Sequence, residues 1–469
     1  MNEIDYIRWI KNLSGYDYLV NCVANHHGFI APQLIKYWLL IMPEGNTDFY
    51  ARLLSIIIFT LLIVILMNVR YEEMDTKTRL LAVFFISING LYIAFSRNAR
   101  LLPLFALLIF CSSIYLYRNI KNHKITTSII LFIISTLSLL THPLSSLFLI
   151  SIVLSSIVVF KFSRNTFIGL VPILLSFILV LPYYIWLISY GKVESELFPL
   201  NFKKVINWIL YLFDDIGTLI TLFVLLVITN NINKVSENIK SCLNNIMFSY
   251  ILLNLIIGLA ILIIISLFIP LTRSYYIFPL VVFSSILLGF VLSGLPSKTI
   301  ALIVTTLSIK GVISYPILEN QLYSFWPSYG FERNILQSFR ESPQYRDIDL
   351  SKSEFINLPI YHTRTFDYYK QGEEKYFPQI DKFGSVEEII NSEYFTKIKD
   401  EKNFYLIIWD DCNKLKDPYQ RKVCLINLDV INRQFSMHQI WEYNFTPKKK
   451  VVKIYILVKN KTNEHEELD

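Results

Sequence analysis

Long apolar runs alternate with short polar segments through the first two thirds of the chain. The runs that carry almost no charge are 50–69, 79–96, 101–117, 126–140, 144–160, 166–189, 216–230, 246–269, 274–294 and 299–315. A helix of about 20 apolar residues crosses a bilayer, and the legs of a helical hairpin are somewhat shorter. The pattern therefore predicts an all-α polytopic membrane bundle over residues 50–315, with about ten visible spans.

The pattern changes after residue 316, where polar residues mix with aromatic ones. Residues 402–411 and 451–460 have the apolar and aromatic pattern of buried strands. Residues 385–398 have the pattern of a helix that begins with a capping box. These elements predict a small α/β domain over residues 316–469.

Charged residues in the connecting segments set the expected orientation. One set of loops holds most of the loop Lys and Arg residues: Arg70, Lys77, Arg79, Arg118, Lys121, Lys124, Lys161, Arg164, Lys234, Lys240 and Lys298. Because positively charged loops stay on the cytoplasmic side, this set is predicted to be cytoplasmic. The opposite set is then outside, and it consists of 1–49, 97–100, 141–143, 190–215, 270–273 and 316–469. The C-terminal α/β domain is therefore expected to be extracytoplasmic.

The N-terminal segment 1–49 falls outside by the same alternation, yet it holds no run able to carry it across a membrane. Its apolar part, 28–42, is short and contains Lys36, which predicts an interfacial helix. Two explanations stay open: a first spanning helix is missing from this chain, or the N-terminus is translocated unusually. We expect the first.

Composition supports a membrane protein and excludes a typical soluble one. Hydrophobic residues make up 54% of the chain and charged residues only 17%. The net charge of +7 lies largely in short loops, so it indicates membrane topology rather than nucleic-acid binding. The five cysteines lack the paired spacing of a thiolate zinc site. Cys412 and Cys424 suit either a disulfide in an oxidising compartment or two free thiols.

Polar residues gather at the predicted external edge of the bundle, where their cost points to function. Arg97 and Arg100 lie three residues apart, against the usual charge bias, just before the run 101–117. If that helix includes both, they share one face at its N-terminus, where backbone N–H groups and guanidinium donors suit an anion. The alternative is that both cations extend to lipid headgroups. Arg273 poses the same choice.

Several other polar residues have both a functional and a structural interpretation. His27 suits an acceptor or a metal, but it also suits a hydrogen-bonded structural role. His142 faces the same external edge, and its place before a proline predicts that it closes a tight turn between two spans. Asp215 follows Asp214 and is expected to cap the helix at 216–230 rather than to act in catalysis.

One cationic stretch and one single lysine are expected to contact the lipid surface. Residues 201–213 are amphipathic and contain Lys203, Lys204 and Trp208. They predict a helix that lies on the outer surface and touches lipid phosphate. Lys310, inside the last apolar run, is predicted to extend outward to the headgroups.

Four short segments of the chain combine His, Arg, Pro and Tyr residues with apolar ones. They are "NHHGFIAPQ" and its continuation, with His27, Pro32 and Arg52; "YIAFSRNARLLPLF", with Arg97 and Arg100; "LLTHPLSSLFL", with Thr141 and His142; and "FIPLTRSYYIFPL", with Arg273 and Tyr275. In this order and spacing they resemble polyprenyl-phosphate-dependent membrane glycosyltransferases of the GT-C superfamily, in the group like dolichyl-phosphate-mannose-protein mannosyltransferase. The resemblance runs from the N-terminus to residue 315 and is weaker in the outer domain.

The resemblance implies transfer of a sugar from a polyprenyl-phosphate donor, bound from the membrane, to an extracytoplasmic glycan or protein acceptor. The residues it assigns are Glu3 and Asp5 as the catalytic base on the acceptor, Arg97, Arg100 and Arg273 at the donor phosphate, and His27, Arg52, Asn98, His142 and Tyr275 around the acceptor cavity. The resemblance is also compatible with a divalent cation, Mg or Mn, as the cofactor. The expected partners include the lipid bilayer and no nucleic acid, and the expected place is the plasma (inner) membrane with the active site outside.

The sequence departs from the family pattern at two carboxylates. An acidic pair in the first loop becomes Asn2 and Glu3, and a Glu in the arginine motif becomes Asn98. Both changes remove a group able to act as a base or to bind a cation. An inactive relative that serves as a binding or scaffold protein is therefore one alternative. A transporter of lipid-linked sugar ranks lower, because the apolar runs look unbroken and no internal repeat is evident.

Overall fold

A computed structural model describes most of the helical part of the chain and the strands of the C-terminal part. The described residues are 28–43, 47–68, 74–96, 101–190, 202–268, 274–325, 342–343, 353–358, 403–408, 425, 428–429, 431–432, 435–445 and 450–459. The chain divides into two compact units, Tyr6–Glu319 and Asn320–Asp469 together with Met1–Asp5, and each is described here by itself.

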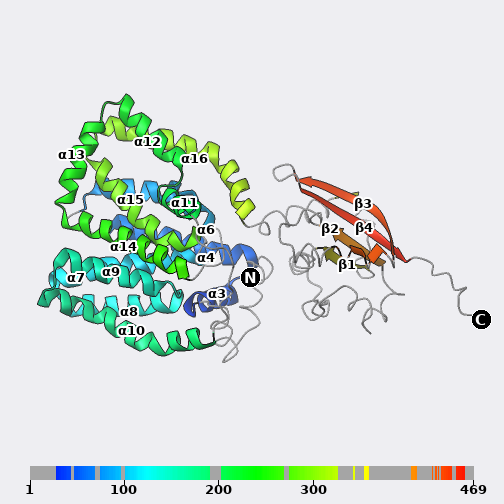
Figure 1. The fold of residues 1–469 in the computed structure, drawn as a ribbon, viewed down its shortest axis with the longest axis horizontal. Helices are drawn as coiled ribbons and strands as arrows, with labels where there is room; N and C mark the ends of the chain where they lie inside the picture. The colour runs from blue at the N-terminus through cyan, green and yellow to red at the C-terminus, as the bar shows by residue number, and fades with distance from the viewer. Residues whose placement is uncertain are drawn as a thin grey trace, which may run out of the picture. The chain divides into compact units, whose positions relative to one another are not determined.

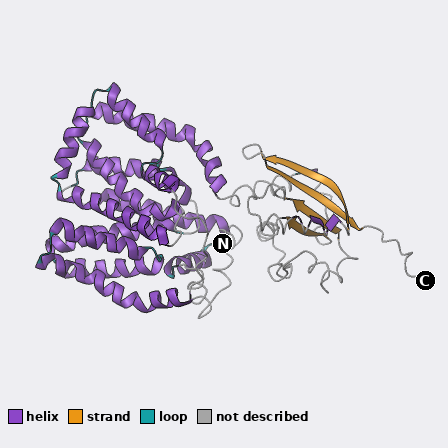
Figure 2. Ribbon diagram, in the orientation of Figure 1, coloured by secondary structure: helices purple, strands orange, loops and turns teal. Residues whose placement is uncertain are grey.

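In the described part of the chain, every apolar run predicted from the sequence is helical, although some runs are divided between two consecutive elements (Figures 1 and 2). The helices are α3 (Ile30–Ile41), α4 (Thr47–Asn68), α5 (Thr76–Ile88), α6 (Gly90–Ser96), α7 (Leu102–Asn122), α8 (Ile125–Thr141), α9 (Ser145–Phe160), α10 (Arg164–Tyr190), α11 (Phe202–Leu212), α12 (Ile216–Ile228), α13 (Ile232–Leu243), α14 (Ile246–Phe268), the 3₁₀ turn η1 (Ser274–Ile277), α15 (Phe278–Ser293) and α16 (Ser297–Phe325). The helix predicted over 28–42 is present as α3, and α16 runs past the predicted end at residue 315.

Fewer helices than the predicted ten spans are long enough to cross a bilayer alone. Within the described residues, α4, α7, α10 and α14 have the required length and apolar character, and the bent pair of α11 and α12 adds a fifth if it counts as one span. Helices α8, α9 and α15 are apolar but shorter. The chain is an integral multi-pass membrane protein in which short apolar helices pack beside full-length ones.

Helices α7 and α15 form the centre of the bundle. Phe105 and Phe110 of α7 and Phe278 and Phe283 of α15 are almost completely buried. On α15 the buried residues run without a gap from Phe278 to Leu287, so this helix is enclosed on all sides. Such a helix is hydrophobic all round because no face of it meets water.

Polar side chains join α7, α9 and α14 inside the bundle. The Tyr250 hydroxyl donates to the Ser113 carbonyl oxygen at 3.0 Å, and Asn254 Nδ2 donates to Ser113 Oγ at 3.3 Å. Ser151 Oγ of α9 donates to the Asn254 carbonyl oxygen at 3.1 Å. Small residues and hydrogen bonds of this kind hold helices together where the hydrophobic effect provides no driving force.

One of the predicted runs is interrupted, so the expectation of unbroken spans was wrong there, and a bend separates two neighbouring predicted elements. The run 79–96 divides at Asn89, whose backbone is extended (ψ 118°) between α5 and α6. Helices α11 and α12 meet at an angle of 51°. Trp208 of α11 is 1% exposed and packs into the bundle rather than against lipid headgroups.

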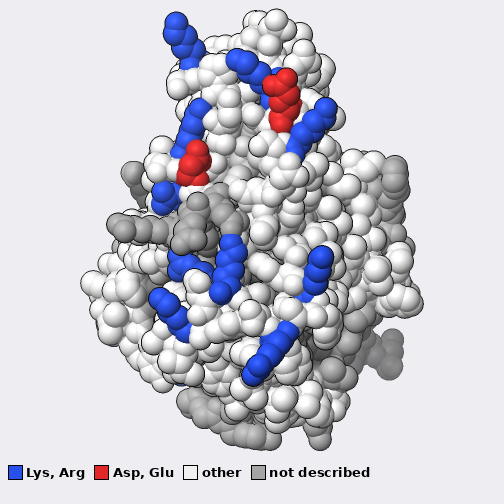
Figure 3. Space-filling view, turned by 90° about the vertical axis from the view of Figure 1, so that its left-hand side faces the viewer, with Lys and Arg blue, Asp and Glu red and all other residues white. Residues whose placement is uncertain are grey.

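Basic side chains cover one end of the bundle. Figure 3 shows this face, the left-hand end in Figure 1, with Lys and Arg side chains far more prominent than Asp and Glu. Some of the cations in the predicted cytoplasmic loops bind helix ends: Arg79 Nη1 donates to the Met67 carbonyl oxygen at 2.9 Å, and Lys77 Nζ donates to that of Leu295 at 2.7 Å. These residues therefore brace the loops as well as setting their orientation.

The C-terminal unit contains a four-stranded sheet in the order β1-β2-β4-β3. Its strands are β1 (Ser353–Leu358), β2 (Asn403–Ile408), β3 (Phe435–Phe445) and β4 (Lys450–Lys459). Strand β1 pairs with β2 in parallel, and β4 is antiparallel to both β2 and β3. The strands predicted over 402–411 and 451–460 are confirmed as β2 and β4. The predicted helix over 385–398, Cys412 and Cys424 lie outside the described residues.

Candidate functional site

Most residues of the predicted site lie outside the part of the chain that the structure describes. They are Glu3, Asp5, His27, Arg97, Asn98, Arg100 and Arg273. Tyr275 lies in η1, but its side chain is not among those described. The roles of all these residues stay predictions. Arg52 and His142 are described, together with the segments that flank the others.

His142 ends α8 and closes the turn into α9, as predicted. Its Nδ1 accepts a hydrogen bond from the Leu144 backbone N–H at 3.2 Å. The imidazole stacks on Phe105 of α7, with ring centroids 4.7 Å apart and planes 19° apart. The Tyr184 hydroxyl of α10 donates to the Pro143 carbonyl oxygen at 3.0 Å. Three helices therefore hold this turn in place.

The segment that follows His27 rests on the same turn. The Phe29 backbone N–H donates to the Leu140 carbonyl oxygen at 2.6 Å. Gly28 lies so close that a Cβ atom there would be 1.7 Å from the Thr141 carbonyl oxygen. Only glycine permits this approach of two backbones. Gly28, the last residue of the "HHG" motif, thus meets the "THP" motif, which lies more than 100 residues later in the sequence.

The segment that contains Arg97 and Arg100 joins two helices at a packed end of the bundle. Helix α6 ends at Ser96, and α7 begins at Leu102 after Leu101 in the left-handed conformation (φ 44°). Both arginines lie in the stretch 97–100, outside the described residues, so their predicted place on one helix face stays a prediction. Pro103, in the first turn of α7, suits the start of a helix.

Aromatic side chains join the flanks of this segment to the flank of Arg273. Tyr92 of α6 stacks on Phe278 of α15, with centroids 3.9 Å apart and planes 15° apart. Phe95 meets the same ring edge-on at 5.9 Å. Phe278 lies five residues beyond Arg273 in the sequence. The described flanks of the two segments that carry the three predicted phosphate-binding arginines therefore lie in contact.

Arg52 lies in the second turn of α4, next to α3. The two helices are joined by Trp38, whose Nε1 donates to the Tyr50 carbonyl oxygen at 2.8 Å. Arg52 itself is half-buried and has interactions of its own. Helix α3, which begins two residues after Gly28, thus places the "HHG" motif and Arg52 on connected elements.

A cluster of charges that was not predicted from the sequence lies where α11 meets α12. Lys310 Nζ of α16 is 2.6 Å from Asp215 Oδ1 and 3.4 Å from Asp214 Oδ2, and it also donates to Thr218 Oγ1. The prediction that Lys310 extends to lipid headgroups was wrong, because two carboxylates bind it at the helix break. The prediction that Asp215 caps its helix is confirmed, since Oδ1 accepts from the Thr218 N–H at 2.6 Å.

Asp214 connects this cluster to the break between α5 and α6. Its Oδ1 accepts a hydrogen bond from the Gly90 backbone N–H at 2.7 Å, and its Oδ2 accepts from Thr218 Oγ1 at 2.8 Å. Asn89 Nδ2 donates to the Tyr211 carbonyl oxygen at 3.0 Å. Hydrogen bonds thus join the break between α5 and α6 to the bend between α11 and α12. Two features of the sequence could have indicated this ion pair: a lysine inside an apolar run, and two adjacent acidic residues in a predicted outer segment.

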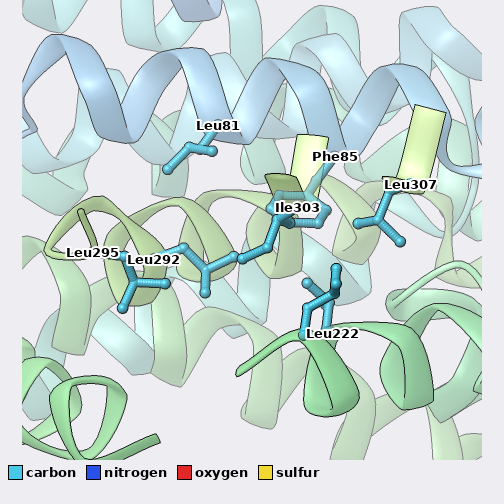
Figure 4. Close-up of a cluster of buried hydrophobic side chains, with 8 residues drawn as sticks. Leu81, Phe85, Leu222, Leu292, Leu295, Ile303 and Leu307 are labelled. Carbon is cyan, nitrogen blue, oxygen red and sulfur yellow. The ribbon is translucent and has the colours of Figure 1, made fainter. Parts of the chain in front are cut away.

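A buried apolar cluster lies one helical turn before Lys310 along α16 (Figure 4). Leu81 and Phe85 of α5, Leu222 of α12, Leu292 of α15, and Ile303 and Leu307 of α16 form one buried cluster, together with Leu225 and Leu295. Lys310 follows Leu307 by one turn of α16. Because the charges lie at the margin of this core, removal of one charge leaves the others without a partner in a partly desolvated place.

Replacement of Lys310 by Met is expected to destabilise the bundle by about 3 kcal/mol, because it leaves two adjacent carboxylates without a cation. The Lys310 side chain is 21% exposed and that of Asp214 is 17% exposed, so water screens the charges only in part. Thermal unfolding in detergent measures the effect. Lys298→Met, at an exposed position on the same helix, is the control and should change little. The double change Asp214→Asn with Lys310→Met should recover part of the loss; a loss equal to the sum of the single changes would contradict the pairing.

A metal site is not assembled by the described side chains. Among the residues that the structure covers, no three His, Cys, Asp or Glu side chains lie close enough to hold an ion. The predicted carboxylates Glu3 and Asp5, with His27, lie outside that part. A divalent cation therefore stays a prediction that depends on the first loop.

Comparison with known proteins gives only distant structural similarity. No family model and no curated protein sequence matches the chain. The chain is similar to the crystal structure of ArnT from Cupriavidus metallidurans bound to undecaprenyl phosphate, with 12% sequence identity and a TM-score of 0.49, over 96% of this chain and 95% of that chain. At this distance the likeness assigns no role to any residue, and the contacts within the chain carry the functional argument.

Proposed function

We propose that this chain is a GT-C-type membrane glycosyltransferase, which moves a sugar from a polyprenyl-phosphate donor to an acceptor outside the cytoplasm. The proposal rests on the sequence resemblance and on one structural observation. That observation is the convergence of the four resembling segments at one end of the bundle.

The convergence follows from contacts between described residues. Phe29 of the first segment bonds to Leu140 of the third, and His142 of the third stacks on Phe105 of the second. Tyr92 of the second stacks on Phe278, which follows the arginine of the fourth. These contacts bring together four segments scattered over some 250 residues. Their meeting is what a shared site requires.

In this proposal the three arginines Arg97, Arg100 and Arg273 bind the donor phosphate. A guanidinium group presents a fork of N–H donors that matches phosphate oxygens, and it remains charged at any physiological pH. The first loop supplies the base through Glu3 or Asp5, which withdraws the acceptor proton as the sugar is transferred. Where a divalent cation binds, it would offset the negative charge on the phosphate. The sugar is either a hexose or a pentose.

The proposed orientation places this end of the bundle outside the plasma (inner) membrane. The basic face in Figure 3 lies at the opposite end of the helices and carries the loops predicted to be cytoplasmic. The bias of cationic loops toward the cytoplasm supports this assignment. A polyprenyl-phosphate sugar would then enter from the outer leaflet.

A transporter of lipid-linked sugar is the second candidate, and the interrupted helices favour it. Thirteen residues of α5 rise about 20 Å, so the break at Asn89 lies about two thirds of the way across a hydrocarbon core of about 30 Å. Breaks at depth, next to charged residues, are a feature of transporters. In this chain Asn89, Asp214 and Lys310 lie at the two breaks. The Asn89 and Asp214 side chains bond to backbone groups across them, and Lys310 pairs with Asp214.

The test uses the purified full chain in lipid nanodiscs with a set of polyprenyl-phosphate sugars and glycan or peptide acceptors. The proposed function predicts acceptor-dependent release of polyprenyl phosphate and a glycosylated product, both detected by mass spectrometry. The same protein in liposomes is tested for movement of fluorescent lipid-linked sugar between leaflets. Movement without release would establish the transporter instead, and donor binding with neither outcome would indicate an inactive relative.

A further inference from the structure

Helix α13 connects α12 to α14 at the left-hand end of the bundle in Figure 1. Its 12 residues rise about 18 Å, which is too short to cross a hydrocarbon core of about 30 Å. The sequence did not predict this helix, because residues 231–245 interrupt the apolar runs and hold Lys234 and Lys240. It therefore joins two apolar helices at an end of the bundle without spanning the membrane itself.

One side of α13 packs against α15 and α16. Asn231 Nδ2, directly before the helix, donates to Thr299 Oγ1 at 3.1 Å, and Asn238 Nδ2 donates to the Val291 carbonyl oxygen at 3.2 Å. Val235 packs against the buried apolar cluster of Figure 4. These three residues of the α13 segment follow one another at spacings of four and three, so they share one face of the helix. Their contacts fix how α13 is rotated about its own axis.

A second side of α13 is apolar and exposed. Ile232, Ile239 and Leu243 are 42%, 39% and 51% exposed, and we call them the apolar stripe. With about 3.6 residues per turn, they lie within about 40° of one another and about 90° from the packed side. Exposed apolar area is unfavourable in water, so a stripe of this kind marks a surface that another apolar phase or molecule covers.

The apolar stripe lies between the lipid-facing surfaces of two neighbouring helices. Phe223, Val227 and Ile228 in the last two turns of α12 are exposed, and so is Ile246, the first residue of α14. Helix α14 has the length and apolar character of a span, and α12 has them together with α11. Exposed apolar side chains of spanning helices meet lipid tails. Exposed apolar residues thus continue from α12 along α13 to α14, which makes lipid the cover that fits the stripe.

The remaining side of α13 is polar and exposed. It carries Lys234, Glu237, Lys240 and Ser241. Lys240 lies about 80° from the centre of the apolar stripe, whereas Lys234 and Ser241 lie on the side opposite the stripe. A lysine next to a lipid-facing stripe extends its ammonium group to the headgroups while its stem covers apolar surface. An apolar stripe beside a polar side is the pattern of a helix that lies along a membrane surface.

We propose that α13 lies along the membrane surface, with the apolar stripe against lipid acyl chains and Lys240 against the phosphate of an anionic headgroup. The prevalence of Lys and Arg at this end of the bundle (Figure 3) also favours anionic lipids. Because α13 is bonded to α15 and α16, the contact sets the level at which the bundle meets the headgroups. On the predicted orientation this is the cytoplasmic leaflet. The proposal does not depend on sugar transfer.

Photo-crosslinking of the full chain in nanodiscs tests the apolar contact. The photoreactive residue p-benzoylphenylalanine replaces Ile239 in one variant and Leu243 in another, and mass spectrometry measures the lipid adducts. Ser241, on the opposite side of the same helix, is the matched control position. We expect about tenfold more phospholipid adduct from positions 239 and 243 than from position 241.

Other covers of the apolar stripe would give different adducts. Crosslinks between two copies of the chain from both stripe positions, with little lipid, would show that a second copy covers the stripe and would overturn the proposal. Equally low lipid yields at all three positions would show that the stripe faces water or a soluble partner, with the same consequence. Thermal unfolding checks that each variant is folded, and the second stripe position decides the question if one variant is not.

Lipid composition tests the role of Lys240. In nanodiscs with equal amounts of phosphatidylglycerol and phosphatidylcholine, adducts at position 239 are expected to favour phosphatidylglycerol about threefold. Lys240→Gln should abolish this preference, and Glu237→Gln should raise it because it removes a negative charge one turn away. Lys234→Gln, opposite the stripe, is the matched control and should leave the preference unchanged. Equal adducts of both lipids in the parent chain, or equal losses in Lys240→Gln and Lys234→Gln, would overturn the assignment of Lys240.

Discussion

Arg100→Ala is expected to lower the rate of sugar transfer at saturating acceptor by about 100-fold or more, because it removes a charged donor pair from the leaving phosphate. The loss should appear in kcat/KM for the donor, measured as release of polyprenyl phosphate from nanodisc-embedded protein. Arg100→Lys keeps the charge but not the fork of N–H groups, so it should recover only part of the rate.

Arg118→Ala is the matched control for this change. Arg118 lies in the last two turns of α7, where its guanidinium is 5.8 Å from the centroid of the Tyr115 ring. Its replacement should leave donor kinetics unchanged. Undiminished turnover in Arg100→Ala would remove the phosphate role of that residue, and an equal loss in Arg118→Ala would point to the general charge of the chain instead.

Gly28→Ala is expected to lower stability by about 3 kcal/mol and to separate the "HHG" motif from the His142 turn. The added Cβ would lie 1.7 Å from the Thr141 carbonyl oxygen and 2.7 Å from the His142 nitrogen, both backbone atoms that no rotamer change can move. One backbone must retreat, and the 2.6 Å bond from the Phe29 N–H to the Leu140 carbonyl oxygen is lost with it.

Gly311→Ala provides the comparison for this prediction. A Cβ at Gly311 meets nothing within 4 Å, so the same chemical change in the helix α16 should stabilise by about 0.5–1 kcal/mol. Thermal unfolding measures both variants, and a cysteine pair at Phe29 and Leu140 reports the separation through its crosslinking rate. If Gly28→Ala unfolds at the parent temperature, the two motifs do not meet in the manner described.

The sequence predicted the elements whose cause is local. Every long apolar run became a helix because an uncharged stretch of that length can satisfy its backbone only by internal hydrogen bonds in a membrane. Strands β2 and β4 were equally clear from their alternation of apolar and aromatic residues. The cap at Asp215 followed from its place immediately before an apolar run.

The sequence did not predict features that depend on contacts between distant segments. The break at Asn89 became visible only with Asp214 as the partner of Gly90, since Asn and Gly also occur inside helices. Lys310 was assigned to the headgroups because its two carboxylate partners lie 95 and 96 positions earlier in the chain. Pairings at such separation leave no periodic signal.

The candidate site was predicted in part. His142 was assigned to a turn because a proline follows it, and the structure confirms that turn. Its stacking on Phe105 and the seating of Gly28 beside Thr141 had no local signal. The placement of Arg97 and Arg100 on one helix face stays a prediction, because both residues lie outside the described part of the chain; the left-handed conformation of Leu101 at the start of α7 had no local signal either.

The enclosure of α15 constrains the order in which the protein assembles. A helix with apolar side chains in every direction is as soluble in lipid as in the bundle, so its insertion does not require its neighbours. Its final slot, however, is lined by α5, α7 and α14, all of which are synthesised earlier. A nascent chain that has not reached Phe278 therefore lacks the helix against which α5, α7 and α14 pack in the complete bundle, so we expect these three helices to take their final places only after α15 is inserted.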